Sequence, residues 1–155
     1  MEHVAIVEFG PGSVGKTTTI KLVYAKLCRI FPDAEIFDLH AKPRKSPDAY
    51  KDIILVLTIH GTKIGLLSQA DPQKIGVVRQ TLRLFVDIGC DIIVCAARGR
   101  GKTLDEVRRL TESGYDVIER CRERNVAEAH RNSNEAEASW IVTRIKKMLA
   151  AVAMT

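Results

Sequence analysis

Two segments of the chain end in the same three residues, Gly-Lys-Thr, and both contain residue types that bind phosphate. The first is GPGSVGKT, residues 10–17, and the second is AARGRGKT, residues 96–103. Glycines let a backbone curl so that successive N–H groups point at a phosphate, and lysine adds a positive charge. A chain of 155 residues seldom has room for two nucleotide sites. The two segments therefore have to be compared.

The first segment has the spacing GxxxxGK[ST] without a gap, and it follows the apolar run VAIVEF and precedes a helical pattern. We expect its N–H groups to point at a β-phosphate and the helix N-terminus to add positive potential. Lys16 would bridge β- and γ-phosphate oxygens, the Thr17 hydroxyl would coordinate Mg²⁺, and Thr18 would lie near the α-phosphate. The alternative is a glycine-rich turn with a chance lysine. The expected binding residues are Gly10, Gly12, Ser13, Val14, Gly15, Lys16, Thr17 and Thr18.

Through this Walker A motif the chain resembles the P-loop nucleoside triphosphate hydrolase superfamily. The resemblance implies an α/β, three-layer P-loop NTPase fold with a mostly parallel sheet. It also implies an enzyme that binds ATP or another NTP with Mg²⁺ and catalyses hydrolysis or phosphoryl transfer. The resemblance does not distinguish hydrolysis from phosphoryl transfer. Within the superfamily, the chain is similar to small nucleotide kinases and stand-alone NTPases.

A site of this kind needs a carboxylate near the metal, and two aspartates compete for that role. Asp71 follows the apolar strand pattern KIGLLSQAD, whereas Asp38 ends the pattern EIFD. The other interpretations are a helix cap for Asp71, which precedes a proline, and a solvated strand end for Asp38. We predict Asp71 as the metal-side and catalytic acid. Ser68 and Gln69 are near enough in sequence to sense the γ-phosphate or to position water.

The second segment fails the motif at one position, because Ala96 stands where the first glycine is required. Thr103 and Glu106 instead fit a capping box, in which threonine caps the following helix. Arg98 and Arg100 follow a buried strand pattern, and ligands of open α/β sheets bind at such strand ends. We expect at least one of these arginines to contact the nucleotide or acceptor and to neutralise the transferred group. A solvated basic loop is the competing interpretation.

The elements that must position these residues alternate between strand and helix patterns, as in an α/β fold. The pattern 52–59, a turn at His60-Gly61 and the pattern 62–68 predict one antiparallel hairpin. The polar stretch 40–52 is expected to be a loop, and Asn134 is expected to be the N-cap of the last helix. The other predicted strands are 4–9, 34–39, 90–97 and 115–119, and the predicted helices are 16–30, 72–88, a helix from 103 and 134–153.

Length and composition predict one domain, residues 1–155, with no membrane partner and a cytoplasmic location. The chain is 46% hydrophobic, and no apolar run reaches the roughly 20 residues of a membrane span. Its four cysteines lack metal-binding spacing, so we expect reduced thiols packed as small hydrophobic side chains. The net charge of +5 favours anionic partners, chiefly a nucleotide, while nucleic acid has only weak support.

Three functions fit these observations. The first is kinase-like transfer of a phosphoryl group from ATP to an unknown small acceptor, and its alternative outcome is ATP hydrolysis. The second is a regulatory NTPase, GTPase-like in its action on a protein partner, although the chain lacks an [NT]KxD run that would read guanine. The third is a nucleic-acid-associated ATPase, which the positive charge suggests.

Overall fold

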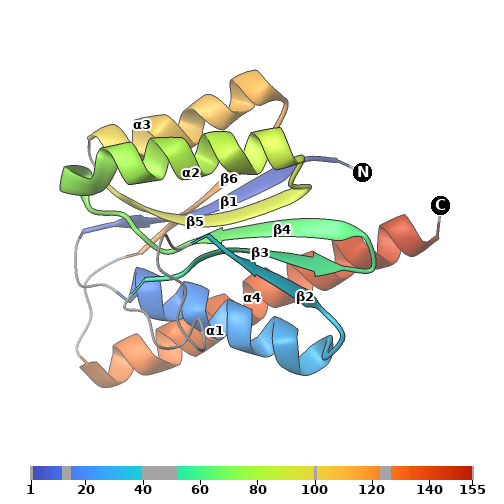
Figure 1. Cartoon of the computed structure of the whole chain (residues 1–155). Coiled ribbons are helices and arrows are strands. Elements are labelled where there is room, and N and C mark those ends of the chain that lie inside the picture. Colours follow the sequence, from blue (N-terminus) through green and yellow to red (C-terminus); the bar gives the residue numbers. More distant parts are fainter. Residues whose placement is uncertain (1, 12–14, 40–51, 100, 123–126, 155) are drawn as a thin grey trace.

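The computed structural model describes residues 2–11, 15–39, 52–99, 101–122 and 127–154, which form three layers around one sheet. Helices α2 (Ile75–Ile88) and α3 (Lys102–Arg108) cover one face, and α1 (Lys16–Ile30) and α4 (Ala127–Ala153) cover the other (Figure 1). Two 3₁₀ segments, Pro72–Lys74 and Arg109–Ser113, adjoin α2 and α3. The chain is thus an α/β protein of three layers.

Six strands form a mixed sheet with the order β2-β3-β4-β5-β1-β6. In the described sheet β3 alone runs against the others, because it pairs antiparallel with both β2 and β4. The remaining pairs are parallel, so five strands end at the same edge of the sheet. The strands are β1 (Val4–Gly10), β2 (Glu35–Asp38), β3 (Ile54–Ile59), β4 (Thr62–Leu67), β5 (Ile92–Arg98) and β6 (Asp116–Cys121).

Most of the predicted elements are confirmed, and the antiparallel hairpin is among them. His60 and Gly61 join β3 to β4 with φ of 49° and 83°, the left-handed conformation that a two-residue hairpin turn requires. The run predicted at 4–9 is β1, which lies between β5 and β6 and is buried from Val4 to Glu8. The predicted loop at 40–52 lies outside the described residues, except for Asp52.

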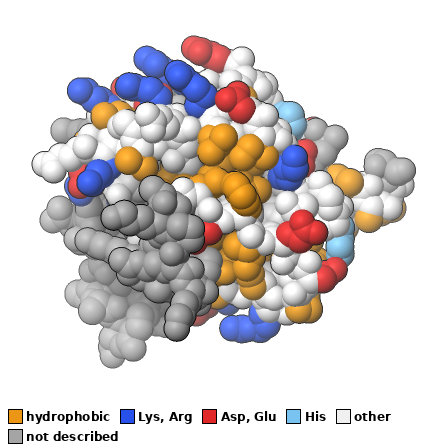
Figure 2. All heavy atoms as spheres, viewed as in Figure 1, with side chains coloured by type: hydrophobic (Ala, Val, Ile, Leu, Met, Phe, Trp, Pro, Cys, Tyr) orange, Lys and Arg blue, Asp and Glu red, His pale blue; other side chains and the backbone are white. Residues whose placement is uncertain are grey.

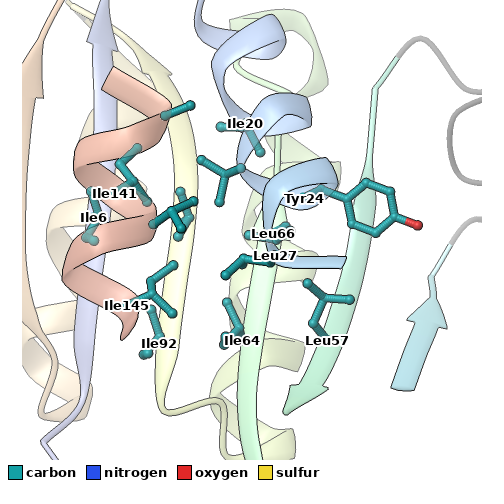
Figure 3. Packing of buried hydrophobic residues seen from close by; sticks show 14 of the residues in the cluster. Ile6, Ile20, Tyr24, Leu27, Leu57, Ile64, Leu66, Ile92, Ile141 and Ile145 are labelled. Carbon is teal, nitrogen blue, oxygen red and sulfur yellow. The ribbon is translucent and has the colours of Figure 1, made fainter. Parts of the chain in front are cut away.

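Two hydrophobic cores hold the layers together, one on each face of the sheet. The core under α1 and α4 is the larger, and Figure 3 shows its side chains pointing between the two helices and the strands. Those labelled there are Ile6, Ile20, Tyr24, Leu27, Leu57, Ile64, Leu66, Ile92, Ile141 and Ile145. In the described part of the chain, no helix has the length and apolar character to cross a membrane.

The four cysteines are free, as expected, but they are not all packed in the core. Cys90 and Cys95 are buried, Cys28 is half-buried, and Cys121 at the end of β6 is exposed. The expectation of a packed hydrophobic thiol is therefore wrong for Cys121.

Two predicted helix caps are also wrong. Helix α3 begins at Lys102 with Gly101 as its N-cap, so Thr103 lies inside the helix and no side chain caps it. Helix α4 begins at Ala127, which places Asn134 in its second turn rather than at its start. Both side chains bond elsewhere in the molecule, because a buried polar group close to a tertiary partner uses that partner instead of its own helix end.

Candidate functional site

The first loop, residues 11–15, joins the end of β1 to the start of α1 at the carboxyl edge of the sheet. Gly15 adopts φ of 85°, which turns the chain directly into the helix. Lys16 is only 6% exposed, and its ammonium donates hydrogen bonds to Gly10 O at 2.8 Å and to Pro11 O at 2.6 Å. An ammonium has three donors, so one remains for a ligand. Gly12, Ser13 and Val14 lie outside the described residues.

Lys16 lies in a positive environment. Burial, followed by the charges of Arg98 and Arg122, lowers the pKa of Lys16 to about 8, although Glu8 acts in the opposite direction. Cations held near one another at the N-terminus of a 15-residue helix create a potential that favours an anion. The site is therefore suited to bind an oxyanion such as a phosphate.

A hydroxyl and a carboxylate lie together where β4 ends. The Thr17 hydroxyl donates to Ser68 O at 3.5 Å, and the Ser68 hydroxyl donates to Asp52 Oδ1 at 3.0 Å. Gln69 Nε2 donates to the other Asp52 oxygen at 3.2 Å. Ser68 is fully buried, and its hydroxyl also accepts from the N–H of Ile53. Ser68 and Gln69 thus hold Asp52 in place, an acid that the sequence interpretation did not single out.

The two aspartates that the sequence did single out have different positions. The Asp71 carboxylate accepts from the N–H of Gln73 at 2.9 Å and caps the short 3₁₀ turn before α2. Its capping role is observed, and its metal role stays a prediction. Asp38 ends β2, four strand-to-strand steps from β1. The start of α1, however, contacts the residue after β4, two steps from β2, through Thr17 and Ser68, so the functional role of Asp38 stays a prediction.

The second loop, residues 99–101, lies directly beside the first. Arg98 at the end of β5 pairs with Gly10 in the sheet register, and the N–H of Gly99 donates to Gly10 O at 3.1 Å. The Thr103 hydroxyl accepts from the N–H of Arg98 at 3.1 Å, while Lys102 is exposed. Arg98 thus lies near the backbone that holds Lys16, and its contact with a nucleotide or acceptor stays a prediction. Arg100 lies outside the described residues.

Arg122, just after β6, joins both ends of the first loop. Its backbone N–H donates to Phe9 O at 2.7 Å, and its guanidinium donates to Glu8 Oε1 at 3.0 Å on β1. The same guanidinium donates to the Thr19 hydroxyl at 2.7 Å on α1. Gly10 leaves room for this arrangement, since a Cβ there would lie 2.3 Å from Arg122 O.

Helix α4 completes this cluster through Asn134. Asn134 Oδ1 accepts from Arg122 at 2.6 Å and from the Thr19 hydroxyl at 3.3 Å. A Cβ on Gly15 would lie 2.3 Å from the same oxygen, so glycine is required where the helix begins. Three elements far apart in sequence, β6, α1 and α4, therefore meet at the base of the first loop.

Glu8 is the buried acid of the cluster. Burial and the charge of Glu137 raise its pKa above the ordinary range, while Arg122 opposes the shift. Glu137 in turn binds Arg120 at 2.7 Å, and the Arg120 guanidinium lies 3.8 Å from the centroid of the Trp140 ring. Glu8 Oε2 has no hydrogen-bond partner among the described residues. A proton on that oxygen would reduce the repulsion between the two carboxylates.

Sequence reasoning missed Asp52 and Arg122 for different reasons. Asp52 had a signal: an antiparallel hairpin places the residue before β3 at the edge where β4 ends. Arg122 had none, because its partner Glu8 lies 114 residues away. Trp140 is half-buried against the larger core, as its helical spacing predicted.

Comparisons of the chain with models of known families, with curated proteins and with solved structures found no match. In the described part of the chain, no group of three or more His, Cys, Asp or Glu residues gathers in a way that could hold a metal ion. The chemistry of the site therefore has to be argued from its own geometry.

Proposed function

We propose that the chain binds ATP and Mg²⁺ at residues 10–18 and transfers the γ-phosphoryl group to a small acceptor. The observation that carries this proposal is the Lys16 ammonium, which two loop carbonyls hold at the start of α1 with one donor left over. A lysine fixed in this way delivers its charge to a phosphate without ordering its side chain first. The glycine spacing of the P-loop superfamily agrees with this role.

Mg²⁺ prefers oxygen ligands, and the residues near Lys16 supply them. Thr17 and Asp52 both contact Ser68, which brings one hydroxyl and one carboxylate to the end of β4. We propose Thr17 as a direct ligand and Asp52 as an acid that holds metal-bound water, with Asp71 as the alternative acid. Bound there, Mg²⁺ would neutralise charge on the β- and γ-phosphate oxygens.

Lys16, Arg98 and the N-terminus of α1 would supply the remaining positive potential around the phosphates. The third donor of Lys16 would bind a β- or γ-phosphate oxygen, and Arg98 lies close enough to lower the pKa of Lys16 by its charge. Arg98 would therefore stabilise the negative charge that develops on the transferred phosphoryl group. Arg100 keeps the same proposed role from the sequence.

The test measures binding and turnover separately. Purified protein is incubated with Mg²⁺ and each NTP, with and without a panel of small anionic acceptors, and nucleotide binding is measured by calorimetry. Lys16→Ala should weaken ATP binding by about 100-fold, since charged hydrogen bonds contribute about 1.5–3 kcal/mol each. Lys102→Ala, an exposed lysine in the second segment, is the matched control. Binding by Lys16→Ala like that of the wild type would overturn the site assignment.

A regulatory NTPase is the second candidate, and one connection favours it. Thr17, Ser68 and Asp52 link the start of α1 to the start of β3, so a ligand at Thr17 acts on the residues that precede β3. A switch of this kind predicts that ATP and ADP give different hydrogen-exchange protection at residues 52–54. Equal protection with both nucleotides contradicts it.

A further inference from the structure

A hollow of about 450 Å³ opens beside the first loop. Its size lies within the range of small-molecule sites, which is about 300–1,000 Å³. The described residues that line it come from the ends of β1, β5 and β6 and from the turn before α2: Phe9, Gly10, Pro11, Pro72, Arg98, Gly99 and Cys121. Lys16 donates to the carbonyls of two of these residues, Gly10 and Pro11, so the hollow lies next to the backbone that holds the ammonium.

The walls of the hollow have a definite chemistry. The rings of Phe9, Pro11 and Pro72 offer apolar surface. Arg98 is the one charged residue among the described lining residues. A ligand that matches these walls has an apolar ring and one oxyanion, because a guanidinium binds phosphate or carboxylate with two parallel hydrogen bonds.

Arg98 differs from the other partly buried arginines. Arg120 is paired with Glu137 and Arg122 with Glu8, so glutamates neutralise both. The Arg98 guanidinium has no hydrogen bond or ion pair within the described part of the chain, and Arg98 pairs in the sheet with Gly10, whose carbonyl binds the Lys16 ammonium. Glu8, the acid that acts on Lys16, is already paired with Arg122, so two neighbouring cations, Lys16 and Arg98, favour an anionic ligand.

We propose that this hollow binds the phosphoryl acceptor, a small molecule with an apolar ring and one phosphate or carboxylate group, which Arg98 anchors. This inference rests on the proposed ATP site. None of the described lining residues is an aspartate, glutamate or histidine that could act as a general base. An oxyanion needs no such base, because it carries no proton that must be removed, and it is the attacking group in this proposal.

The proposed phosphoryl transfer needs no reactant other than ATP and the acceptor. An oxygen of the acceptor's oxyanion forms a bond to the γ-phosphorus, and the bond from that phosphorus to the oxygen bridging the β-phosphate breaks. The electron pair leaves with ADP, and no proton moves. The positive charge of Arg98 would reduce the mutual repulsion between the two anions, which opposes this approach.

Cys121 supplies a direct measure of occupancy, because it is exposed and lines the hollow, whereas Cys90 and Cys95 are buried. The probe is phenyl phosphate, a ring with one oxyanion, and phenol and inorganic phosphate are its two separate halves. Alkylation of Cys121 by N-ethylmaleimide is followed by peptide mass spectrometry, with and without a non-hydrolysable ATP analogue. ADP release with ATP and phenyl phosphate is measured in parallel.

Phenyl phosphate should slow alkylation of Cys121 both with and without the ATP analogue, and either half alone should protect far less. Arg98→Ala and Arg98→Gln should weaken this protection by about tenfold to 100-fold, the usual effect of losing a charged hydrogen bond. Arg83→Ala, an exposed arginine on α2, is the control. Thermal unfolding confirms that each variant is folded.

Three results would overturn the proposal: no protection by phenyl phosphate, equal protection in Arg98→Ala, or loss of protection when the ATP analogue binds. The last would mean that the probe occupies the nucleotide phosphate site. Failure of the proposed function has a different signature, because the wild type would then bind no nucleotide whether or not phenyl phosphate protects Cys121.

Discussion

The two segments that end in Gly-Lys-Thr leave neighbouring strands at the same edge of the sheet, yet they use lysine and threonine in opposite ways. In the first, Lys16 is buried and binds its own loop; in the second, Lys102 is exposed. Thr17 contacts β4, whereas Thr103 is buried and binds the N–H of Arg98. The same three residues thus provide a buried lysine ammonium in the first segment and a structural hydrogen bond in the second.

The length of the connection explains the difference. Five residues, 11–15, separate β1 from α1, and three, 99–101, separate β5 from α3. A longer connection offers more N–H groups that can converge on a phosphate. The helix that follows also differs, with 15 residues in α1 and seven in α3. The second segment supports the first, because Gly99 donates to Gly10 O.

The contrast is tested most strongly at Arg122, which binds both ends of the first loop and, among the described residues, makes no such contact with the second. Arg122→Ala should lower the free energy of unfolding by about 3–5 kcal/mol, because it leaves Glu8 buried without its partner. Arg108→Ala removes an exposed ion pair with Glu119 and should cost less than about 1 kcal/mol. Urea unfolding of the two variants makes the comparison. Equal losses would show that the buried cluster contributes no more than a surface pair.

The next effect compares two glycines with positive φ, Gly15 at 85° and Gly101 at 96°. Alanine should strain both positions by about 1–2 kcal/mol. Only at Gly15 does the added Cβ meet another residue, Asn134, whereas nothing lies within 4 Å at Gly101. Gly15→Ala should therefore weaken ATP binding by about tenfold or more, and Gly101→Ala should leave it nearly unchanged. Calorimetric titration with Mg·ATP distinguishes them.

The pH dependence of ATP affinity should distinguish the role of Lys16 from that of Lys102. The protonated ammonium binds phosphate, and the pKa of Lys16 in the free protein is about 8, below its ordinary value of 10.5. Affinity should be constant below that pH and should fall by about tenfold per unit above it. Dissociation constants measured from about pH 7 to about pH 9.5 test this. Lys102→Ala should follow the same curve, and a flat curve for the wild type would contradict the role of Lys16.

The smallest effects are expected at the two threonines, and they should be opposite in kind. Thr103→Val removes the acceptor of the Arg98 N–H and should cost about 1 kcal/mol of stability while ATP affinity stays the same. Thr17→Val should change stability little and should weaken the Mg²⁺-dependent part of ATP binding. Thermal unfolding and titrations with and without Mg²⁺ measure both. If both variants lost stability and neither changed ATP binding, Thr17 and Thr103 would have the same structural role, which contradicts the prediction.

The strands and helices were predictable because hydrophobic periodicity is local. The apolar run before the first loop and the helical spacing after it predicted β1 and α1, and the His60-Gly61 turn predicted the hairpin. The order of the strands was not predictable in this way. That β5 lies between β1 and β4 depends on packing between segments far apart in sequence.

The candidate site was predictable where one segment supplies it and not where several do. Lys16 and Thr17 follow from a continuous motif. Thr103 and Asn134 were assigned to helix caps because a cap is the nearest use for such side chains, but each found a tertiary partner instead. Arg122 and Glu8 meet only when β6 pairs with β1, and no local pattern encodes that pairing.

The edge strand β2 affects how the protein behaves at high concentration. Its Ile36 and Phe37 side chains are 46% and 63% exposed, and Figure 2 shows hydrophobic side chains gathered in a band on this face of the molecule. Two copies that met edge to edge in antiparallel register would place Glu35 of one opposite Asp38 of the other. Like charges facing each other across such a pair oppose it. The four residues of β2 thus combine two apolar side chains that favour self-association with two acids that resist it.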